Sequence, residues 1–348
     1  MRIEELIVPG NLPAIDAMRR LSETGRRIVF IAPDRVLQAV LTDSDVRKFI
    51  LRGGDLASPV AEVANHSPKF LPVEERARAR EVMDRHSIEA LPLLDKAGRI
   101  TDIVFVQDLG GVHIQKNLDM PVVIMAGGLG TRLYPYTRIL PKPLIPIGEV
   151  PIVERVMDKF AGFGCGRFTL VVNYRKNMIK SYFADSESAY VIEYAEEEQP
   201  LGTGGGLCLL KGRVNETFFL TNCDILINAD YADIADFHRR ENNDITVVCA
   251  TKQYVIPYGV VELDEGGGFG ALSEKPHMNF LTNTGMYVVQ PGVVQQIEDG
   301  VSQGFTDIIA QCKARGGRVG VYPVSEDSWM DMGQIEELDE MRRRFENN

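Results

Sequence analysis

Residues 122–144 read VVIMAGGLGTRLYPYTRILPKPL, and this segment decides the fold of the second part of the chain. Its first four residues are apolar and mostly β-branched, which is typical of a strand buried on both faces of a sheet. Three glycines follow directly, Gly127, Gly128 and Gly130. Such a loop at the carboxyl end of a strand, with a helix starting after it, brings backbone N–H groups close to an anion. The segment therefore predicts an α/β sheet with a phosphate-binding loop.

Two cationic side chains follow this loop. Arg132 comes directly after it, and Lys142 lies ten residues further on between two prolines. The segment is no Walker A loop, because no Gly-Lys-Ser/Thr follows, and it is no G-x-G-x-x-G motif, because Leu133 stands where the third glycine belongs. The alternative to a phosphate site is a tight turn after a core strand, with two ordinary surface charges.

The segment resembles, almost residue for residue, the signature of the sugar-1-phosphate nucleotidyltransferases, G-G-x-G-T-R-L-x-P-x-T followed by P-K-P-L. The resemblance implies a Rossmann-like (GT-A-like) α/β domain with a mostly parallel sheet, which the alternation of predicted helices and strands up to residue 251 also favours. It further implies that Arg132 and Lys142 are catalytic residues that hold phosphates. The loop residues that the resemblance assigns to the nucleotide are Ala126, Gly127, Gly128, Gly130 and Thr131.

Composition narrows the class of protein. A chain of 348 residues with 45% hydrophobic residues predicts two domains. The net charge of −11 argues against a general nucleic-acid or anionic-membrane surface. Five cysteines without C-x-x-C spacing predict neither a disulfide framework nor a zinc site, which fits a reducing cytoplasm. No signal sequence and no membrane-length apolar run is found, so we expect a cytoplasmic protein without a membrane partner.

The first 116 residues read as two copies of one α+β unit. Each copy predicts a short amphipathic helix and two strands joined by a turn, and 63 residues separate Asp45 and Asp108, which close the two copies. The predicted helices cover 14–21 and 77–83, and the predicted strands cover 27–32, 36–41, 90–94 and 100–106. A glycine-rich and polar linker follows at 110–121. We place the domains at 1–117 and 118–348.

The repeated unit resembles a pair of CBS motifs, a Bateman module. The resemblance implies a regulatory role, in which Thr42 binds a phosphate and Asp45 the ribose hydroxyls of an adenine or guanine nucleotide. The second copy retains Asp108, but Phe105 stands at the position of the threonine. The resemblance also implies a homo-oligomer. A small dimerisation module without a ligand is the alternative.

Two further motifs belong to the nucleotide and metal sites of the resembled family. Residues 201–206 read LGTGGG, and the resemblance assigns Gly202, Thr203 and Gly204 to the nucleotide; a flexible loop is the alternative. Asp224 ends an apolar strand, and Asp331 lies in the phrase WMDMG. The resemblance implies that both carboxylates bind Mg²⁺, which prefers oxygen ligands.

A predicted β-hairpin carries the residues assigned to the sugar phosphate. Its strands cover 257–262 and 271–276, with a turn at 264–268, and a further strand starts at Asn283. The resemblance implies that four residues surround the sugar phosphate: Gly259, Glu274, Lys275 and Asn283. A turn glycine, a surface ion pair and a strand-edge amide are the alternatives.

The implied reaction joins a nucleoside triphosphate to a sugar-1-phosphate and releases pyrophosphate. The attacking phosphate oxygen is already an anion, so no enzymic base or covalent nucleophile is needed. The scattered histidines are therefore given no role and are expected to be solvated: His66, His86, His113, His238 and His277.

The order of the two domains resembles the glucosamine-1-phosphate guanylyltransferases of bacterial legionaminic acid synthesis. GTP and glucosamine-1-phosphate are therefore the first choice of substrates, for surface glycan synthesis. The alternatives are mannose- or heptose-1-phosphate guanylyltransferases, and glucose-1-phosphate uridylyl- or thymidylyltransferases. A non-catalytic nucleotide sensor is the alternative from another class, although all the charged site residues are retained.

Overall fold

The computed structural model describes residues 2–86, 88–109, 117–184 and 190–346. The chain forms two compact units, each described by itself below. Unit 1 comprises Met1–Ile114, Ala250–Thr282 and Pro323–Asp327, and unit 2 comprises Gln115–Cys249, Asn283–Tyr322 and Ser328–Asn348. Most of the linker expected at 110–121, and with it His113, lies outside the described residues. The domain boundary after residue 117 stays a prediction.

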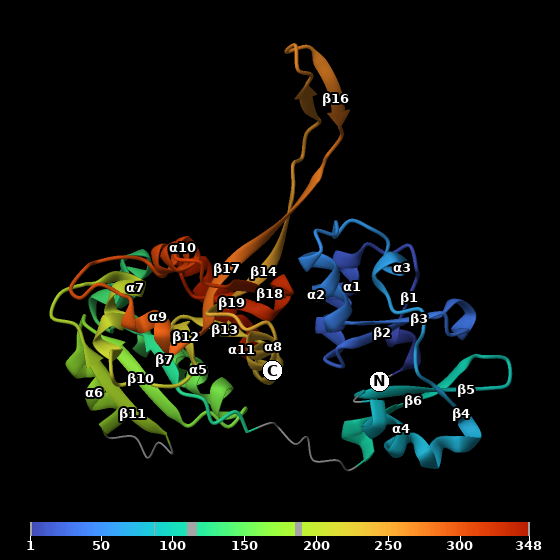
Figure 1. Cartoon of the computed structure of the whole chain (residues 1–348), viewed down its shortest axis with the longest axis horizontal. Helices are drawn as coiled ribbons and strands as arrows, with labels where there is room; N and C mark the ends of the chain where they lie inside the picture. The colour runs from blue at the N-terminus through green and yellow to red at the C-terminus, as the bar shows by residue number, and fades with distance from the viewer. Residues whose placement is uncertain (1, 87, 110–116, 185–189, 347–348) are drawn as a thin grey trace. The chain divides into compact units, whose positions relative to one another are not determined.

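The first 109 residues contain two sheets of the same topology. In each sheet the first strand pairs in parallel with the second, and the second pairs antiparallel with the third. The strands of the first sheet are β1 (Ile7–Val8), β2 (Ile28–Ile31) and β3 (Ala39–Thr42), and those of the second are β4 (Leu71–Pro72), β5 (Ala90–Leu94) and β6 (Ile100–Phe105). The helices of the two halves are α1 (Ala14–Thr24), α2 (Asp43–Leu51), α3 (Val60–Val63) and α4 (Ala79–His86) (Figure 1). The predicted repeat is therefore confirmed as a repeat of structure.

The two halves meet at equivalent positions. Val36 and Arg99 form an antiparallel bridge, and the two residues are 63 positions apart, as are Asp45 and Asp108. The N–H of Leu37 donates to the carbonyl of Gly98 at 3.1 Å beside this bridge. An apolar layer that both halves supply lies next to it: Leu6, Ile28, Phe30, Ala32, Ala90, Leu94, Ile100, Ile103 and Phe105. The halves thus pair at equivalent positions and share this apolar layer, while each half also has an apolar core of its own.

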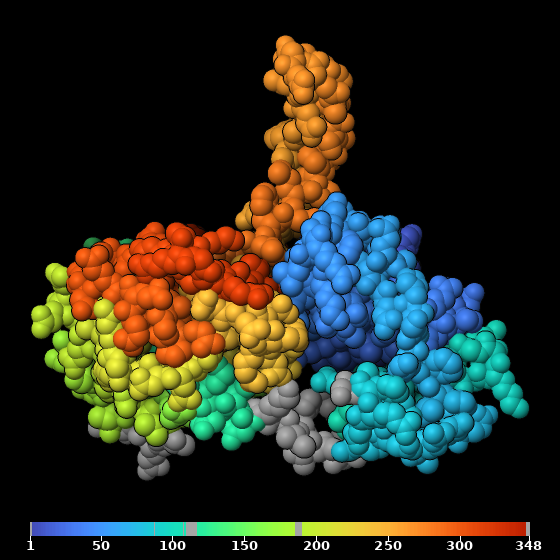
Figure 2. All heavy atoms as spheres, in the orientation of Figure 1, coloured from blue at the N-terminus to red at the C-terminus, as the bar shows by residue number. Residues whose placement is uncertain are grey.

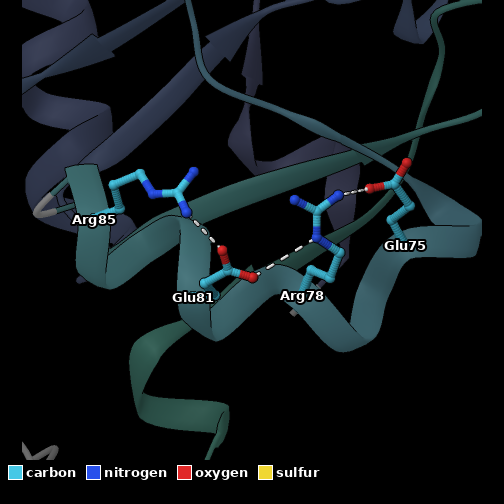
Figure 3. Close-up of polar contacts among 4 residues, drawn as sticks. All are labelled: Glu75, Arg78, Glu81 and Arg85. Carbon is cyan, nitrogen blue, oxygen red and sulfur yellow. Dashed lines mark hydrogen bonds and ion pairs between the residues drawn. The ribbon is translucent and has the colours of Figure 1, made fainter.

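The arginine-rich stretch before and within α4 is neutralised by carboxylates. Glu81 accepts from Arg85 at 2.6 Å and lies 3.7 Å from Nε of Arg78, which also pairs with Glu75 (Figure 3). All four side chains are exposed, so each pair contributes little to stability. This stretch is therefore a solvated, charge-balanced face.

Unit 2 is built on a seven-stranded sheet. The strands, in the order in which they pair, are β11 (Val191–Glu196), β10 (Arg167–Val172), β7 (Val122–Met125), β12 (Phe218–Asn222), β17 (His277–Val289), β14 (Ile245–Val255) and β18 (Val319–Val324) (Figure 1). The first four strands run parallel, and β17 is antiparallel to β12. All residues of β7 are buried, as the apolar run predicts. A largely parallel central sheet is therefore confirmed.

Helices pack on this sheet through apolar and aromatic side chains. They are α5 (Ile152–Ala161), α6 (Lys176–Ala184), α7 (Gly202–Gly205), α8 (Tyr231–Arg240), α9 (Pro291–Gln295), α10 (Phe305–Ala314) and α11 (Ile335–Glu346). Phe160 of α5 lies 5.2 Å from Phe219 of β12 and 4.7 Å from Tyr231 of α8, measured between ring centroids. Both helices are thereby anchored to one strand of the sheet. None of the helices in the described part of the chain is long and apolar enough to cross a membrane.

The helix start expected after the glycine loop is wrong. The chain instead makes three short 3₁₀ turns, Thr131–Leu133, Tyr136–Arg138 and Lys142–Leu144, and the next α-helix is α5. Pro135 and Pro141 explain the difference, because proline lacks the N–H that a continuing helix needs. Any anion at this loop is therefore held by loop groups and side chains, with no helix dipole behind them.

The hairpin predicted at 257–276 is confirmed. It consists of β15 (Val260–Leu263) and β16 (Phe269–Ser273), which pair antiparallel around the turn at 264–268. β14 and β17 lead into it, and β17 begins at His277, earlier than the strand expected from Asn283 (Figure 1). Figure 2 shows this segment in orange. Large apolar side chains along it are exposed, including Tyr258, Leu263 and Phe269.

Candidate functional site

The glycine loop is shaped by close contacts at two of its glycines. Gly130 has φ +63°, and a Cβ on it would lie 2.8 Å from the side chain of Thr137 and 3.2 Å from Cβ of Lys142. A Cβ on Gly127 would lie 2.8 Å from the carboxylate of Glu197. Position 130 therefore favours glycine for its backbone conformation and its close contacts, and a side chain at position 127 would have to displace Glu197. Gly128, in contrast, has open space around it, and Thr131 is exposed.

The backbone of Ala126 takes part in the pairing of the sheet. Its N–H donates to the carbonyl of Val171 at 2.8 Å. This N–H continues the pairing of β7 with β10 and is not free for a ligand. The nucleotide contact predicted for Ala126 therefore has to come from another atom of the residue.

The structure brings four of the predicted residues into one charged cluster at the carboxyl edge of the sheet. Lys142 forms an ion pair with Asp224, and their side chains are only 13% and 11% exposed. β13 (Ile225–Ile227) pairs with β19 (Trp329–Asp331) so that Asp331 lies opposite Ile225, and the N–H of Met332 donates to the carbonyl of Asp224 at 2.9 Å. Arg132 is exposed at the rim and acts electrostatically on Asp331. Lys142 and Asp224, 82 positions apart, thus meet here with Asp331, which lies 107 positions after Asp224.

The charges in this cluster are unevenly balanced. Burial and the neighbouring Asp224 raise the pKa of Asp331 to about 6, against the opposing effect of Lys142. Burial alone would lower the pKa of Lys142, but Asp224 and the other negative neighbours raise it, so the ammonium stays charged. One cation therefore neutralises Asp224 and leaves Asp331 short of positive charge.

This arrangement fits a divalent cation. Oδ1 of Asp331 is buried and accepts no hydrogen bond from the described residues. A cation between Asp331 and Asp224 would partner this oxygen and remove the repulsion between the carboxylates. Among the described residues no group of three or more His, Cys, Asp or Glu side chains could hold a metal ion. A cation here would keep further ligands from water or substrate, as Mg²⁺ prefers.

A polar cavity of about 240 Å³ adjoins Asp331. It lies where β7 and β12 end, which is where open α/β sheets bind ligands. Two other predicted residues, Thr203 and Asn283, line it together with polar residues that the sequence analysis missed, Asn222 and Thr306. The full lining is Met125, Thr203, Leu220, Asn222, Ile225, Asn283, Thr284, Gly285, Tyr287, Phe305, Thr306, Trp329 and Asp331.

Some of the missed residues had a signal in the sequence. Asn222 directly precedes Cys223-Asp224 at the end of the apolar strand, so the same strand-end argument applies to it. The hydroxyl of Tyr287 accepts a hydrogen bond from Asn283 Nδ2 at 2.7 Å and orients that amide. Thr306 gave no signal, because its place depends on α10 packing against α7.

The second glycine cluster is explained by packing. A Cβ on Gly202 or Gly204 would lie 2.6 Å from a backbone carbonyl oxygen of Gln303 or Gly304. The N–H of Gly204 donates to the carbonyl of Gln303 at 3.0 Å, so this N–H is already used. Thr203 accepts from the N–H of Phe305 at 3.2 Å. Nucleotide contacts by these three residues stay a prediction.

The predicted sugar-phosphate residues divide between the two units. Asn283 belongs to the cavity of unit 2, whereas Gly259, Glu274 and Lys275 lie exposed on the hairpin in unit 1. Within the hairpin, a Cβ on Gly259 would lie 3.0 Å from Oε2 of Glu274, so these two residues are neighbours. Lys275 has φ +47°, a conformation that few non-glycine residues adopt.

The predicted CBS ligand residues make internal contacts. Asp45 Oδ2 accepts from the N–H of Thr42 at 3.0 Å and from its hydroxyl at 2.7 Å, which forms a capping box at the start of α2. Asp108 lies 3.5 Å from Arg26, whose guanidinium also lies 4.3 Å from the centre of the Phe105 ring. A nucleotide site at these residues stays a prediction.

The expectation that the histidines are solvated is wrong for His238, which is fully buried. Gln290 Nε2 lies 3.1 Å from His238 Nε2, and an amide nitrogen only donates, so Nε2 accepts and Nδ1–H donates to Thr246 Oγ1 at 2.9 Å. Burial lowers the pKa of His238 to about 4. His66, His86 and His277 are exposed.

The fold and the charged cluster define an α/β protein with a charged and polar site at the carboxyl edge of its sheet. The chain belongs to the nucleotidyl transferase family, whose family model matches residues 121–348. The site therefore lies within the part of the chain that carries the family likeness.

The proteins similar to this chain include mannose-1-phosphate guanylyltransferases. The chain is 32% identical over 222 residues to a mannose-1-phosphate guanylyltransferase of Mycobacterium tuberculosis, and the match covers 62% of each chain. It is 32% identical over 228 residues to a mannose-1-phosphate guanyltransferase of Emericella nidulans, covering 62% of this chain and 61% of that one. The chain thus spans less than two thirds of the length of these relatives.

Solved structures show the same fold. The crystal structure of HddC from Yersinia pseudotuberculosis complexed with GMP-PN aligns with a TM-score of 0.52 and 22% identity, covering 65% of this chain and 99% of that one. At this identity the likeness shows the fold alone.

Proposed function

We propose that this chain is a sugar-1-phosphate guanylyltransferase, which joins GMP from GTP to a sugar-1-phosphate and releases pyrophosphate. The observation that carries the proposal is the cluster of Arg132, Lys142, Asp224 and Asp331 beside a polar cavity at the carboxyl edge of the sheet. Two mannose-1-phosphate guanylyltransferases among its relatives support guanine as the base. A non-catalytic sensor has no need of the charged cluster, which favours the enzyme.

In the proposed reaction a phosphate oxygen of the sugar-1-phosphate attacks the α-phosphorus of GTP, and the bond to the pyrophosphate oxygen breaks. Lys142 and Arg132 attract and align the phosphates, and Arg132, exposed at the rim, is placed to hold the departing pyrophosphate. Asp224 and Asp331 are the residues that would hold Mg²⁺, which would neutralise phosphate charge. Thr203, Asn222 and Asn283 offer the hydroxyl and amide groups that bind sugar or ribose hydroxyls.

The relatives and the order of the domains point to different sugars. The relatives favour mannose-1-phosphate, and the order of the domains favours glucosamine-1-phosphate for a surface glycan such as legionaminic acid. We place glucosamine-1-phosphate first and mannose-1-phosphate second. Heptose-1-phosphate, or a uridylyl or thymidylyl reaction with glucose-1-phosphate, would be the next combinations to examine.

The test is pyrophosphate release over a matrix of four nucleoside triphosphates and these sugar-1-phosphates with Mg²⁺. We expect turnover with GTP and one sugar phosphate, and a loss of more than about 100-fold in Asp224→Asn. Asp339→Asn, on the exposed side of α11, is the matched control and should keep wild-type rates. Silence over the whole matrix, or full turnover by Asp224→Asn, would contradict the proposal.

We also propose that residues 1–117 form a tandem CBS module that binds an adenine or guanine nucleotide and assembles the chain into a homo-oligomer. The twofold repeat, with Val36 and Arg99 paired across it, supports this proposal. Asp45→Asn can keep the capping box but removes the charge. We expect calorimetry to find a nucleotide whose binding Asp45→Asn weakens without loss of turnover, and a module that binds none would be structural.

A further inference from the structure

Tyr174 and Arg175, which follow β10, hold the glycine loop through a series of hydrogen bonds. Tyr174 Oη donates to the carbonyl of Thr137 at 3.2 Å and accepts from Arg175 Nε at 2.9 Å. Arg175 Nη2 donates to the carbonyl of Arg138 at 2.7 Å. Thr137 Oγ1 in turn donates to the carbonyl of Gly130 at 2.8 Å. Two residues after one strand thus hold the loop that follows another.

Tyr174 also contacts the start of the glycine loop through its backbone. The N–H of Tyr174 approaches the carbonyl of Gly127 at 3.4 Å, so the contacts fall on both sides of the loop's turn. The receiving carbonyls at Thr137 and Arg138 belong to a 3₁₀ turn, which has weaker internal hydrogen bonding than an α-helix. External donors are therefore well placed to fix this turn.

Arg175 adopts a backbone conformation that needs external support. Its φ is +51°, in the left-handed region that non-glycine residues rarely adopt. The side chain is held by the Arg138 carbonyl and the Tyr174 hydroxyl, and its guanidinium lies 5.4 Å from the centre of the Tyr174 ring. Strained residues of this kind persist where surrounding contacts fix them, and they cluster at functional sites.

The hydrogen bonds act on a residue of the charged cluster. Thr137 is fully buried and packs against Gly130, whose missing side chain leaves room for both Thr137 and Cβ of Lys142. A shift of Thr137 therefore moves Gly130, and with it the backbone that carries Lys142. Because Lys142 is paired with Asp224, the shift also changes the position of the cation relative to that carboxylate.

We propose that Tyr174 and Arg175 are positioning residues that hold the loop at 127–142 in the shape that receives the triphosphate. This proposal rests on the proposed function, because it takes the loop as the nucleotide-binding loop. It predicts that loss of either side chain affects the nucleotide and the rate but leaves binding of the sugar-1-phosphate unchanged. Neither side chain needs to touch a substrate.

Two variants of the full chain and one control test the proposal. Tyr174→Phe removes the hydroxyl alone. Arg175→Asn removes the guanidinium and keeps a residue that tolerates a positive φ. Tyr182→Phe is the control, because it deletes a tyrosine hydroxyl that donates to Glu154 in the same unit at 2.6 Å, away from the loop. Amide hydrogen exchange of the peptides that cover 127–142 is measured without substrate, together with steady-state kinetics and thermal unfolding.

We expect faster exchange over 127–142 in both variants and a fall of about 10- to 100-fold in kcat/KM for the nucleotide. The KM for the sugar-1-phosphate should stay within about twofold, with an unfolding temperature close to that of Tyr182→Phe. Unchanged exchange overturns the proposal, as does faster exchange with unchanged kinetics. An equal loss for both substrates together with a lower unfolding temperature shows general destabilisation and also overturns it.

A wild-type chain that is silent with every substrate contradicts the proposed function. In that case the exchange comparison still decides the structural part of the inference: faster exchange at 127–142 in the two variants shows that the side chains hold the loop, and equal exchange shows that they do not.

Discussion

Buried His238 makes the stability of unit 2 depend on pH in a calculable way. Its ring is neutral in the folded chain, where burial lowers the pKa from 6.5 to about 4. In the unfolded chain the ring takes up a proton as the pH falls below 6.5. The unfolded state thus binds more protons between pH 6.5 and about 4, and stability is full above this window and falls as the pH drops through it.

The two pKa values give the magnitude. The whole shift corresponds to about 3 kcal/mol, and about 2 kcal/mol of it is lost between about pH 7.5 and about pH 5. Protonation also removes the acceptor at Nε2, which faces the amide nitrogen of Gln290 at 3.1 Å. The oxygen of the same amide accepts from Thr217 at 3.1 Å, so in the folded chain its nitrogen faces the ring. The hydrogen bonds thus agree with the direction of the pKa shift.

The assay is urea unfolding followed by the fluorescence of Trp329, the one tryptophan of the chain, which lies in β19 of unit 2. Wild type, His238→Gln and the exposed control His86→Gln are compared at both pH values. Carboxylates contribute equally to all three chains, so the difference between them isolates the ring. We expect wild type and His86→Gln to lose about 2 kcal/mol more than His238→Gln. An equal loss in all three chains would refute the reasoning.

Three further outcomes follow from the site and the module. Lys142→Met leaves the buried carboxylate of Asp224 without its cation, so it should lower the free energy of unfolding by about 3 kcal/mol and abolish turnover. The double variant Lys142→Met/Asp224→Asn should regain stability in urea unfolding but not turnover. A double variant as unstable as Lys142→Met would argue against the ion pair. Gly206→Ala places a Cβ onto the buried carboxylate of Glu197 and should lower the unfolding temperature by several degrees. Gly128→Ala is the control and should not lower it, because Gly128 has open space around it. Equal melting curves of the two variants would contradict the packing argument. Asp45→Ala breaks the capping box and should cost about 1 kcal/mol in urea unfolding, and no change would show that the cap does not stabilise unit 1.

The sequence predicts best what depends on local patterns. The buried strand at 122–125 and the hairpin around 264–268 follow from the order of apolar and turn residues. The position of the two carboxylates came from the family likeness, and the pairing of β13 with β19 brings them together.

Contacts between segments far apart in the sequence lie beyond such local patterns. Gly202 and Gly204 are needed because residues about 100 positions later pack against them, which no local pattern shows. His238, in contrast, could have been found. It lies seven residues after Tyr231 and four after Ile234, on the apolar face of α8, and this spacing predicts burial.

The bridge between Val36 and Arg99 has a consequence for the origin of unit 1. The two residues occupy the same position in their repeats, as a twofold relation between the repeats would require. A protein with a single repeat would form the same bridge with a second copy of itself and would cover its half of the shared apolar layer in the same way. Duplication and fusion of a gene for such a homodimer would turn an intermolecular interface into an intramolecular one without a new contact.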